Sequence, residues 1–215
     1  MKKFTLMFAG LLIAGTAGAE VLSITSGVDL SDPTQLSVDA GFSSGDVDTL
    51  GFRVNYRLNP EFLVFGGLGS SDIGPESDLS FGGGVIYTLP DFNLPFDSGI
   101  KASFFRWSGS YGFHGFGSVD VDINEFTVRY VMSGNVEPVE NLKWFGEAGL
   151  HFLSSSVSYS SSIDRSVRGG STSWDDTELG LEAGLLYDFN EDFTGIVSLE
   201  IVDSTFINLG VRYKF

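Results

Sequence analysis

The chain has no cysteine among its 215 residues, few basic residues, and no long apolar run after residue 19. The absence of cysteine excludes a disulfide-stapled fold, so backbone pairing and packing must supply the stability. Only 12 Lys and Arg stand against 28 Asp and Glu, which argues against nucleic acid or an anionic lipid surface as the main partner. No phosphate-binding loop, zinc-ligand spacing or other cofactor motif occurs, so we expect no cofactor.

The first 19 residues have the three parts of a secretory signal peptide. Lys2 and Lys3 form a positively charged start, residues 4–14 are apolar, and Ala17-Gly18-Ala19 supplies the small-residue cleavage pattern. The apolar run is too short for the alternative, a membrane-anchoring helix, which needs roughly 20 residues. We therefore expect export through the Sec pathway, cleavage between Ala19 and Glu20, and a mature chain with 10 basic and 28 acidic residues.

The rest of the sequence alternates between apolar and polar residues with a period of two and has no sustained helical periodicity, which is typical of β-strands. The C-terminal strand shows the alternation best. Its odd positions are Ile207, Leu209, Val211, Tyr213 and Phe215, whereas its even positions include Arg212 and Lys214. One face is therefore apolar with an aromatic end, as expected of a strand that faces lipid and ends at the membrane interface.

The same alternation recurs along the chain and predicts ten strands. We place them at residues 35–43, 47–58, 61–70, 78–89, 98–107, 119–132, 141–157, 174–189, 193–202 and 204–215. Short breaker segments at 59–61, 90–95, 134–141 and 190–192 would be the periplasmic turns. The longest outer loops would be the Gly- and Ser-rich segments 108–118 and 158–173. A count of eight strands is the alternative.

Strands that face lipid must pair on both edges, because an unpaired backbone group in a bilayer costs several kcal/mol. The sequence therefore predicts the all-β class and, in particular, a closed antiparallel up-and-down transmembrane β-barrel over residues 35–215. With an even number of strands, both ends of the barrel chain lie on the periplasmic side. Residues 20–34 fit no strand and are expected to form a periplasmic segment that leads into the first one.

The signal peptide, the alternating strands and the terminal Tyr213-Lys214-Phe215 together resemble the small outer-membrane β-barrel family, which includes opacity-type surface proteins. The resemblance covers nearly the whole mature chain as a pattern. It implies location in the outer membrane of a Gram-negative bacterium and recognition of the last strand, residues 207–215, by the barrel-assembly machinery. It does not imply one activity, since such barrels include adhesins, pores, structural tethers and a few enzymes.

Many charged residues occupy the polar faces of the predicted strands and cannot face lipid. By parity, a lumen charge network is expected from Arg53, Arg57, Glu125, Arg129, Lys143, Glu147, His151, Glu178, Glu182, Glu200 and Arg212. Two interpretations remain open. The residues form either a salt-bridged set that fills a narrow barrel or the wall of a small polar pore. We favour the filled barrel, because ten strands leave little open width.

His151 is the first candidate for catalysis. Glu147 lies on the same strand face, but four residues along a strand correspond to roughly 13 Å, which is too far for contact. A partner for His151 must therefore come from a neighbouring strand, from a residue such as Glu178 or Glu182.

Other features weaken an enzymatic interpretation. Ser154 lies on the opposite strand face from His151, and the lipid A deacylases of the resembled family have His and Ser two residues apart, where this chain has Phe152 and Leu153. His114 falls in a Gly-rich segment that suits a recognition loop better than a rigid site. We expect no enzyme and no catalytic or metal site.

Two acidic pairs, Asp120/Asp122 and Asp175/Asp176, are expected near the outer rim. We interpret them as a solvated rim, and the alternative is the binding of divalent cations that bridge lipopolysaccharide phosphates.

The expected function is that of an integral outer-membrane barrel with a structural or surface-interaction role, such as envelope integrity or adhesion-like presentation of loops. The alternatives are a narrow channel for small solutes and a lipid A-modifying or surface-proteolytic enzyme. The expected partners are outer-membrane lipid and lipopolysaccharide, with the barrel-assembly machinery and periplasmic chaperones during biogenesis. We expect a monomer.

Overall fold

The computed structural model describes residues 27–45, 47–73, 76–90, 93–113, 117–160 and 170–215. The predicted signal peptide and its cleavage site at Ala19 and Glu20 lie outside these residues. Within the described ranges, no helix has the length and apolar character needed to cross a membrane.

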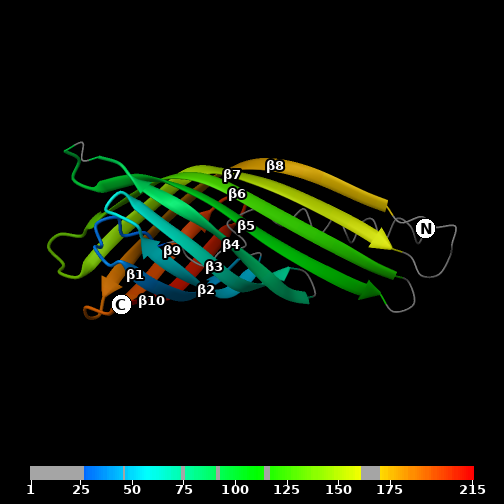
Figure 1. Cartoon of the computed structure of the whole chain (residues 1–215), viewed down its shortest axis with the longest axis horizontal. Helices are drawn as coiled ribbons and strands as arrows, with labels where there is room; N and C mark the ends of the chain where they lie inside the picture. Colours follow the sequence, from blue (N-terminus) through cyan, green and yellow to red (C-terminus); the bar gives the residue numbers. More distant parts are fainter. Residues whose placement is uncertain (1–26, 46, 74–75, 91–92, 114–116, 161–169) are drawn as a thin grey trace.

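Antiparallel strands close into one barrel (Figure 1). The strands are β1 (Leu36–Ser44), β2 (Asp48–Arg57), β3 (Phe62–Ile73), β4 (Glu76–Thr88), β5 (Asp97–Phe113), β6 (Gly117–Asn135), β7 (Leu142–Ser160), β8 (Gly170–Asp188), β9 (Phe193–Ile201) and β10 (Thr205–Lys214). Each strand pairs with its neighbours in sequence, and β1 pairs with β10, from Ser37 opposite Lys214 to Ser44 opposite Ile207. The predicted fold class and the count of ten are confirmed, and the eight-strand alternative is excluded.

A continuous apolar band surrounds the outside of the barrel. On β8 it runs over nine residues from Leu179 to Tyr187, which matches the roughly 9–11 residues that a tilted strand needs to cross a bilayer. The apolar residues at odd positions from Ile207 to Phe215 all lie on this outer face. Their recognition during assembly stays a prediction.

The two ends of the barrel differ. One end, which we call the turn end, carries the short turns and the C-terminal residue Phe215, and aromatic pairs such as Phe193–Tyr213 (5.0 Å between ring centroids) and Tyr187–Phe189 (5.3 Å) lie close to it. Such pairs are typical of a membrane interface. At the opposite end, β5, β6, β7 and β8 run past the other strands (Figure 1), and we call this the long-strand end.

The long strands correct the predicted loops at 108–118 and 158–173. Strand β5 continues to Phe113 and β6 begins at Gly117, while β7 continues to Ser160 and β8 begins at Gly170. The described Gly and Ser residues of these segments pair in regular ladders, which run to Gly112 opposite Ser118 and to Tyr159 opposite Gly170, and residues 114–116 and 161–169 lie outside the described part of the chain. Composition alone misidentified the described parts of these segments as loops, because their outward side chains are polar instead of apolar.

Polarity in fact reverses between the two strand faces along β5–β8. The outermost lipid-facing residues are Phe104, Phe126, Phe152 and Leu179. Beyond them the outward-facing side chains are polar and include Arg106, Asp120, Asp122, Ser154, Ser156, Ser158 and Asp175. The inward-facing side chains become apolar and buried, and they include Trp107, Val121, Ile123 and Val157. The reversal marks where lipid ends and water begins on the outside of the barrel.

Candidate functional site

Arg129 on β6 is fully buried in the lumen and contacts acidic side chains from three strands. Its Nη1 lies 3.3 Å from Oε2 of Glu147 on β7 and 3.4 Å from Oε2 of Glu182 on β8. Its Nη2 forms an ion pair with Glu200 on β9. Lys101 on β5 lies 2.7 Å from the same oxygen of Glu147. Because all five side chains are buried, these ion pairs tie five strands together across an interior that excludes bulk water.

His151 completes this group, which we call the central cluster: Lys101, Glu125, Arg129, Glu147, His151, Glu182 and Glu200. Nδ1 of His151 lies 2.9 Å from Oε1 of Glu125, and Arg129 donates from Nε to Nε2 of the ring over 3.0 Å. An Nε2 that accepts leaves the ring proton on Nδ1, which donates to Glu125. The partners of His151 therefore fit the neutral imidazole.

The carboxylate 2.9 Å from Nδ1 of His151 comes from a neighbouring strand, as expected, but it belongs to Glu125 of β6 and not to the expected Glu178 or Glu182 of β8. Glu178 is opposite His151 in the β7–β8 ladder, yet the imidazole lies over Gly180, two residues further along β8, where a Cβ would meet the ring. The missing side chain of Gly180 lets the ring extend toward Arg129, and Glu125 of β6 then supplies the carboxylate. The ring has no exposed surface.

A second group, the Asp39 cluster, lies on the opposite wall and consists of Asp39, Arg53, Asn55 and Arg212. Oδ2 of Asp39 lies 2.9 Å from Nη2 of Arg53, and Oδ1 lies 2.7 Å from Nε of Arg212. Asn55 donates to the same carboxylate over 3.0 Å. Two guanidinium groups and an amide therefore hold the carboxylate of Asp39, and Asp39 itself has no exposed surface.

Sequence reasoning missed Asp39 and Lys101. Both occupy polar positions between apolar neighbours in their strands, so the parity argument that found the other residues would have found these two. Asp39 lies in β1 and Lys101 in β5, whose polar faces are otherwise made mostly of small residues, and this weakened the signal.

Residues 27–34 fold into the turn end of the lumen, and we call this segment the N-terminal plug. Asp29 binds Lys143 of β7 over 2.6 Å, and Asp32 binds Lys214 of β10 over 3.1 Å. Burial alone would raise the pKa of Asp32, but the hydrogen bonds from Thr34 and the positive charge of Lys214 outweigh it and hold the pKa below its ordinary value.

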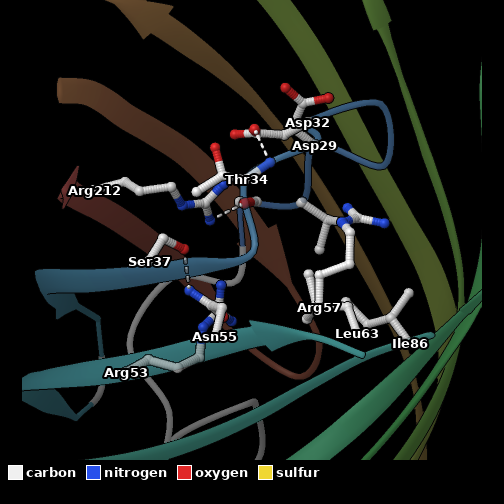
Figure 2. A pocket seen from close by; sticks show the side chains of 12 residues that line it. Asp29, Asp32, Thr34, Ser37, Arg53, Asn55, Arg57, Leu63, Ile86 and Arg212 are labelled. Carbon is white, nitrogen blue, oxygen red and sulfur yellow. Dashed lines mark hydrogen bonds between the residues drawn. The ribbon is translucent and has the colours of Figure 1, made fainter. Parts of the chain in front are cut away.

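Backbone contacts also hold the N-terminal plug, and Figure 2 shows Arg212 beside Asp29, Asp32 and Thr34 in this region. Arg212 donates from Nη2 to the carbonyl oxygen of Gly27 over 2.6 Å, and the amide of Leu30 donates to Oγ of Ser133 over 3.0 Å. Val28 and Leu30 are buried. The cavity left between the plug and the wall near Arg53 has a volume of about 20 Å³, which is room for a single water molecule.

The other predicted lumen residues lie apart from the two clusters. Arg57 donates to the carbonyl oxygens of Pro60 (3.2 Å) and Leu30 (3.4 Å) at the turn end. Lys143 binds Asp29 of the plug. Glu178 is half-buried, and its Oε2 has no hydrogen-bond partner among the described residues.

The catalytic candidates do not converge. Ser154 lies on the outer face of β7, across the wall from His151, and His114 lies outside the described residues. In the part of the chain that the structure describes, no three His, Asp or Glu side chains are arranged to hold a metal ion.

No protein-family model and no curated protein sequence matches the chain. Solved structures do match. The outer membrane protease OmpT of Escherichia coli superposes with a TM-score of 0.52 at 12% identity, over 85% of this chain and 94% of that one. A KdgM porin gives 0.46 at 14% identity, over 83% and 99%, and Ail of Yersinia pestis gives 0.38 at 17% identity, over 84% and 95%. At these identities the likeness concerns the fold alone, and the chain has the fold of the small outer-membrane β-barrels.

Proposed function

We propose that this protein is a closed, non-enzymatic barrel of the outer membrane whose role is structural or lies in surface interaction. The observation that carries the proposal is the filled lumen. Arg129 and Lys101 bridge carboxylates from three strands in the middle of the barrel, and the N-terminal plug occupies its turn end.

A filled lumen argues against steady passage of solutes. A solute would have to separate ion pairs whose members have no contact with bulk water, and breaking one buried pair costs about 3–5 kcal/mol. At the turn end it would also have to displace Asp29 and Asp32 from Lys143 and Lys214. Both barriers lie on the same path through the lumen, so we expect the barrel not to conduct ions.

The buried position of His151 supports the non-enzymatic role. A general base must come within hydrogen-bond reach of its substrate, whereas both ring nitrogens of His151 are engaged by Glu125 and Arg129 and the ring has no exposed surface. The imidazole thus fits an architectural role, as a neutral link between a carboxylate of β6 and the guanidinium of Arg129.

Planar-bilayer recording of the purified full-length barrel tests the closed lumen. Insertion is verified on the same sample by a heat-modifiable band on gels and by protection from protease. We expect no steady single-channel steps from inserted protein. Steady steps of one size would refute the closed lumen and establish the narrow channel.

We further propose that the long-strand end faces the outside of the cell and the turn end faces the periplasm. The support is the polar outer surface of β5–β8 beyond Phe126 and Phe152, which suits water and the sugar layer of lipopolysaccharide, together with the short turns at the other end. Lipid and lipopolysaccharide are then the permanent surroundings of the barrel. Export through the Sec pathway, delivery by periplasmic chaperones and insertion by the assembly machinery belong to the same proposal.

The lack of native cysteine makes the orientation simple to test. Ser156→Cys places a thiol on the outer surface of β7 beyond the apolar band, and Glu140→Cys places one in an exposed turn at the other end. In intact cells a membrane-impermeant maleimide should label the first variant and not the second, while lysed cells should label both. The reverse pattern would invert the proposed orientation, and labelling of neither variant in isolated outer membranes would refute the location.

A further inference from the structure

Among the described residues, strand β8 has an edge without a partner strand at the long-strand end. Its ladder with β9 begins only at Leu181, opposite Ile201, whereas its ladder with β7 extends to Gly170, opposite Tyr159. Over residues 170–180, no described strand pairs with β8 on the side away from β7. Because Leu179 is the last lipid-facing residue of β8, nearly all of this edge projects beyond the apolar band, into water.

The register shows which residues of this edge offer hydrogen bonds. Asp188 donates its amide to Asn141, next to β7, and the β7–β8 register runs without a break to Gly170. Backbone groups alternate in direction along an antiparallel strand, so even-numbered residues bond to β7 and odd-numbered residues point away. Thr177 is odd-numbered, and its amide accordingly does not bond to β7. It donates to Oδ1 of the neighbouring Asp176 over 2.7 Å.

The side chains of the edge are acidic and accessible. Asp175, Asp176 and Glu178 lie within four consecutive residues, the two aspartates are exposed, and the glutamate is half-buried. Residues 170–180 contain no Lys, Arg or Pro, although Lys and Pro are the residues that usually prevent an exposed edge from pairing. The edge therefore has no residue that usually prevents strand pairing, and its negative charge favours a strand that carries positive charge.

We propose that the β8 edge, residues 171–179, binds an extended basic segment of another protein by β-strand addition. Main-chain hydrogen bonds to the odd-numbered residues would supply affinity, and Lys or Arg at alternate positions would meet Asp176 and Glu178, which share one face of β8. The inference goes beyond the proposed function, because it depends on the sheet outside the apolar band and not on whether the lumen conducts.

Charge selects this occupant over a second copy of the chain. Two β8 edges paired antiparallel would bring three carboxylates of each copy together, and like charges opposite each other destabilise a strand pair. The chain is also strongly acidic as a whole, with a formal net charge of −16. A basic segment gains from the same charges that oppose self-pairing.

Fluorescence anisotropy with synthetic nine-residue peptides tests the proposal on the full-length barrel folded in a zwitterionic detergent. The first peptide alternates Thr and Lys, the second alternates Thr and Glu, and the third is the Thr/Lys peptide with every second backbone amide N-methylated. We expect only the first to bind well. N-methylation should weaken binding by at least about fivefold, the effect of one lost backbone hydrogen bond.

Two pairs of variants separate the backbone edge from charge. Ser173→Pro removes an amide that points to the free edge, whereas Ser173→Ala retains it, so only the proline variant should lose affinity. Asp175→Asn with Asp176→Asn removes two charges at the edge, and Asp120→Asn with Asp122→Asn removes two charges from the central strand β6 of the same sheet. The first pair should weaken binding more than the second.

Three results would overturn the proposal. The first is the absence of binding of the Thr/Lys peptide to folded barrel. The second is equal binding of the N-methylated peptide together with full affinity of Ser173→Pro, which would reduce the effect to charge attraction. The third is a stable dimer in sedimentation that Ser173→Pro dissociates and Ser173→Ala retains, which would make a second copy the occupant.

Discussion

Replacing Arg129 with Met should destabilise the barrel strongly. The change keeps a long side chain but removes the charge that Glu147, Glu182 and Glu200 share. Breaking one buried ion pair leaves an uncompensated charge at a cost of about 3–5 kcal/mol. With a urea dependence of about 1–3 kcal/mol per molar, the midpoint of unfolding should fall by at least about 1 M. Tryptophan fluorescence in urea, on barrel folded into lipid vesicles, measures the midpoint.

Arg106→Met is the matched control. Arg106 also forms an ion pair, with Asp122 at 2.8 Å, but the two side chains are 44% and 39% exposed. An exposed pair contributes about 0–1 kcal/mol, so the control should shift the midpoint little. If Arg129→Met were as mild as Arg106→Met, the ion pairs of the central cluster would not stabilise the barrel, and the main support for a closed lumen would be lost.

Three further predictions concern other parts of the barrel. Gly180→Ala should lower the urea midpoint more than Gly66→Ala, because a Cβ at Gly180 meets the His151 ring whereas a Cβ at Gly66 has only an ordinary contact at 3.7 Å. Because the pKa of Asp32 is lowered, its contribution to the stability of the N-terminal plug is present above the ordinary carboxyl pKa and is lost as pH falls through the lowered value. The protection of the plug amides from hydrogen exchange should therefore fall only at strongly acidic pH. Phe215→Asp should reduce the amount of barrel in the outer membrane, measured on blots of membrane fractions, and unchanged amounts would refute the role of the last strand.

The barrel itself could be predicted from the sequence because lipid imposes a simple rule. Every lipid-facing position must be apolar, and successive side chains of a strand point to opposite faces. The alternation from Ile207 to Phe215 therefore identifies both the strand and its orientation. Breakers such as Asn59-Pro60 then separate one strand from the next, and the count of ten follows.

The contacts inside the lumen were harder to predict. Parity tells which side chains point inward, and it places Glu125, Arg129 and His151 on the inner face. It does not tell how far a side chain reaches or over which neighbour it lies. His151 was assigned a partner on β8 from ladder proximity, but the space above Gly180 and the length of Arg129 decide the pairing.

The N-terminal plug had no periodic signal, because residues 27–34 form no strand. What holds it is a set of charge pairs with residues far along the chain, such as Asp29 with Lys143 and Asp32 with Lys214. Pairs of this kind follow from the closed fold and not from local sequence. Only after β7 and β10 are placed do the acids of residues 27–34 have defined partners.

The missed extension of β5–β8 has a different cause and a consequence for function. Alternation continues through these segments, but its sign reverses, because Phe104 and Phe126 face lipid whereas Arg106 and Asp122 face water. The prediction followed the alternation past the membrane boundary on β6, β7 and β8, but it ended β5 at residue 107, where Gly and Ser indicated a loop, although the strand continues to Phe113. The same reversal explains why a free edge can exist there at all. An unpaired backbone group is prohibitive in lipid and tolerable in water, so the part of β8 that leaves the lipid is the part that can remain open for a partner.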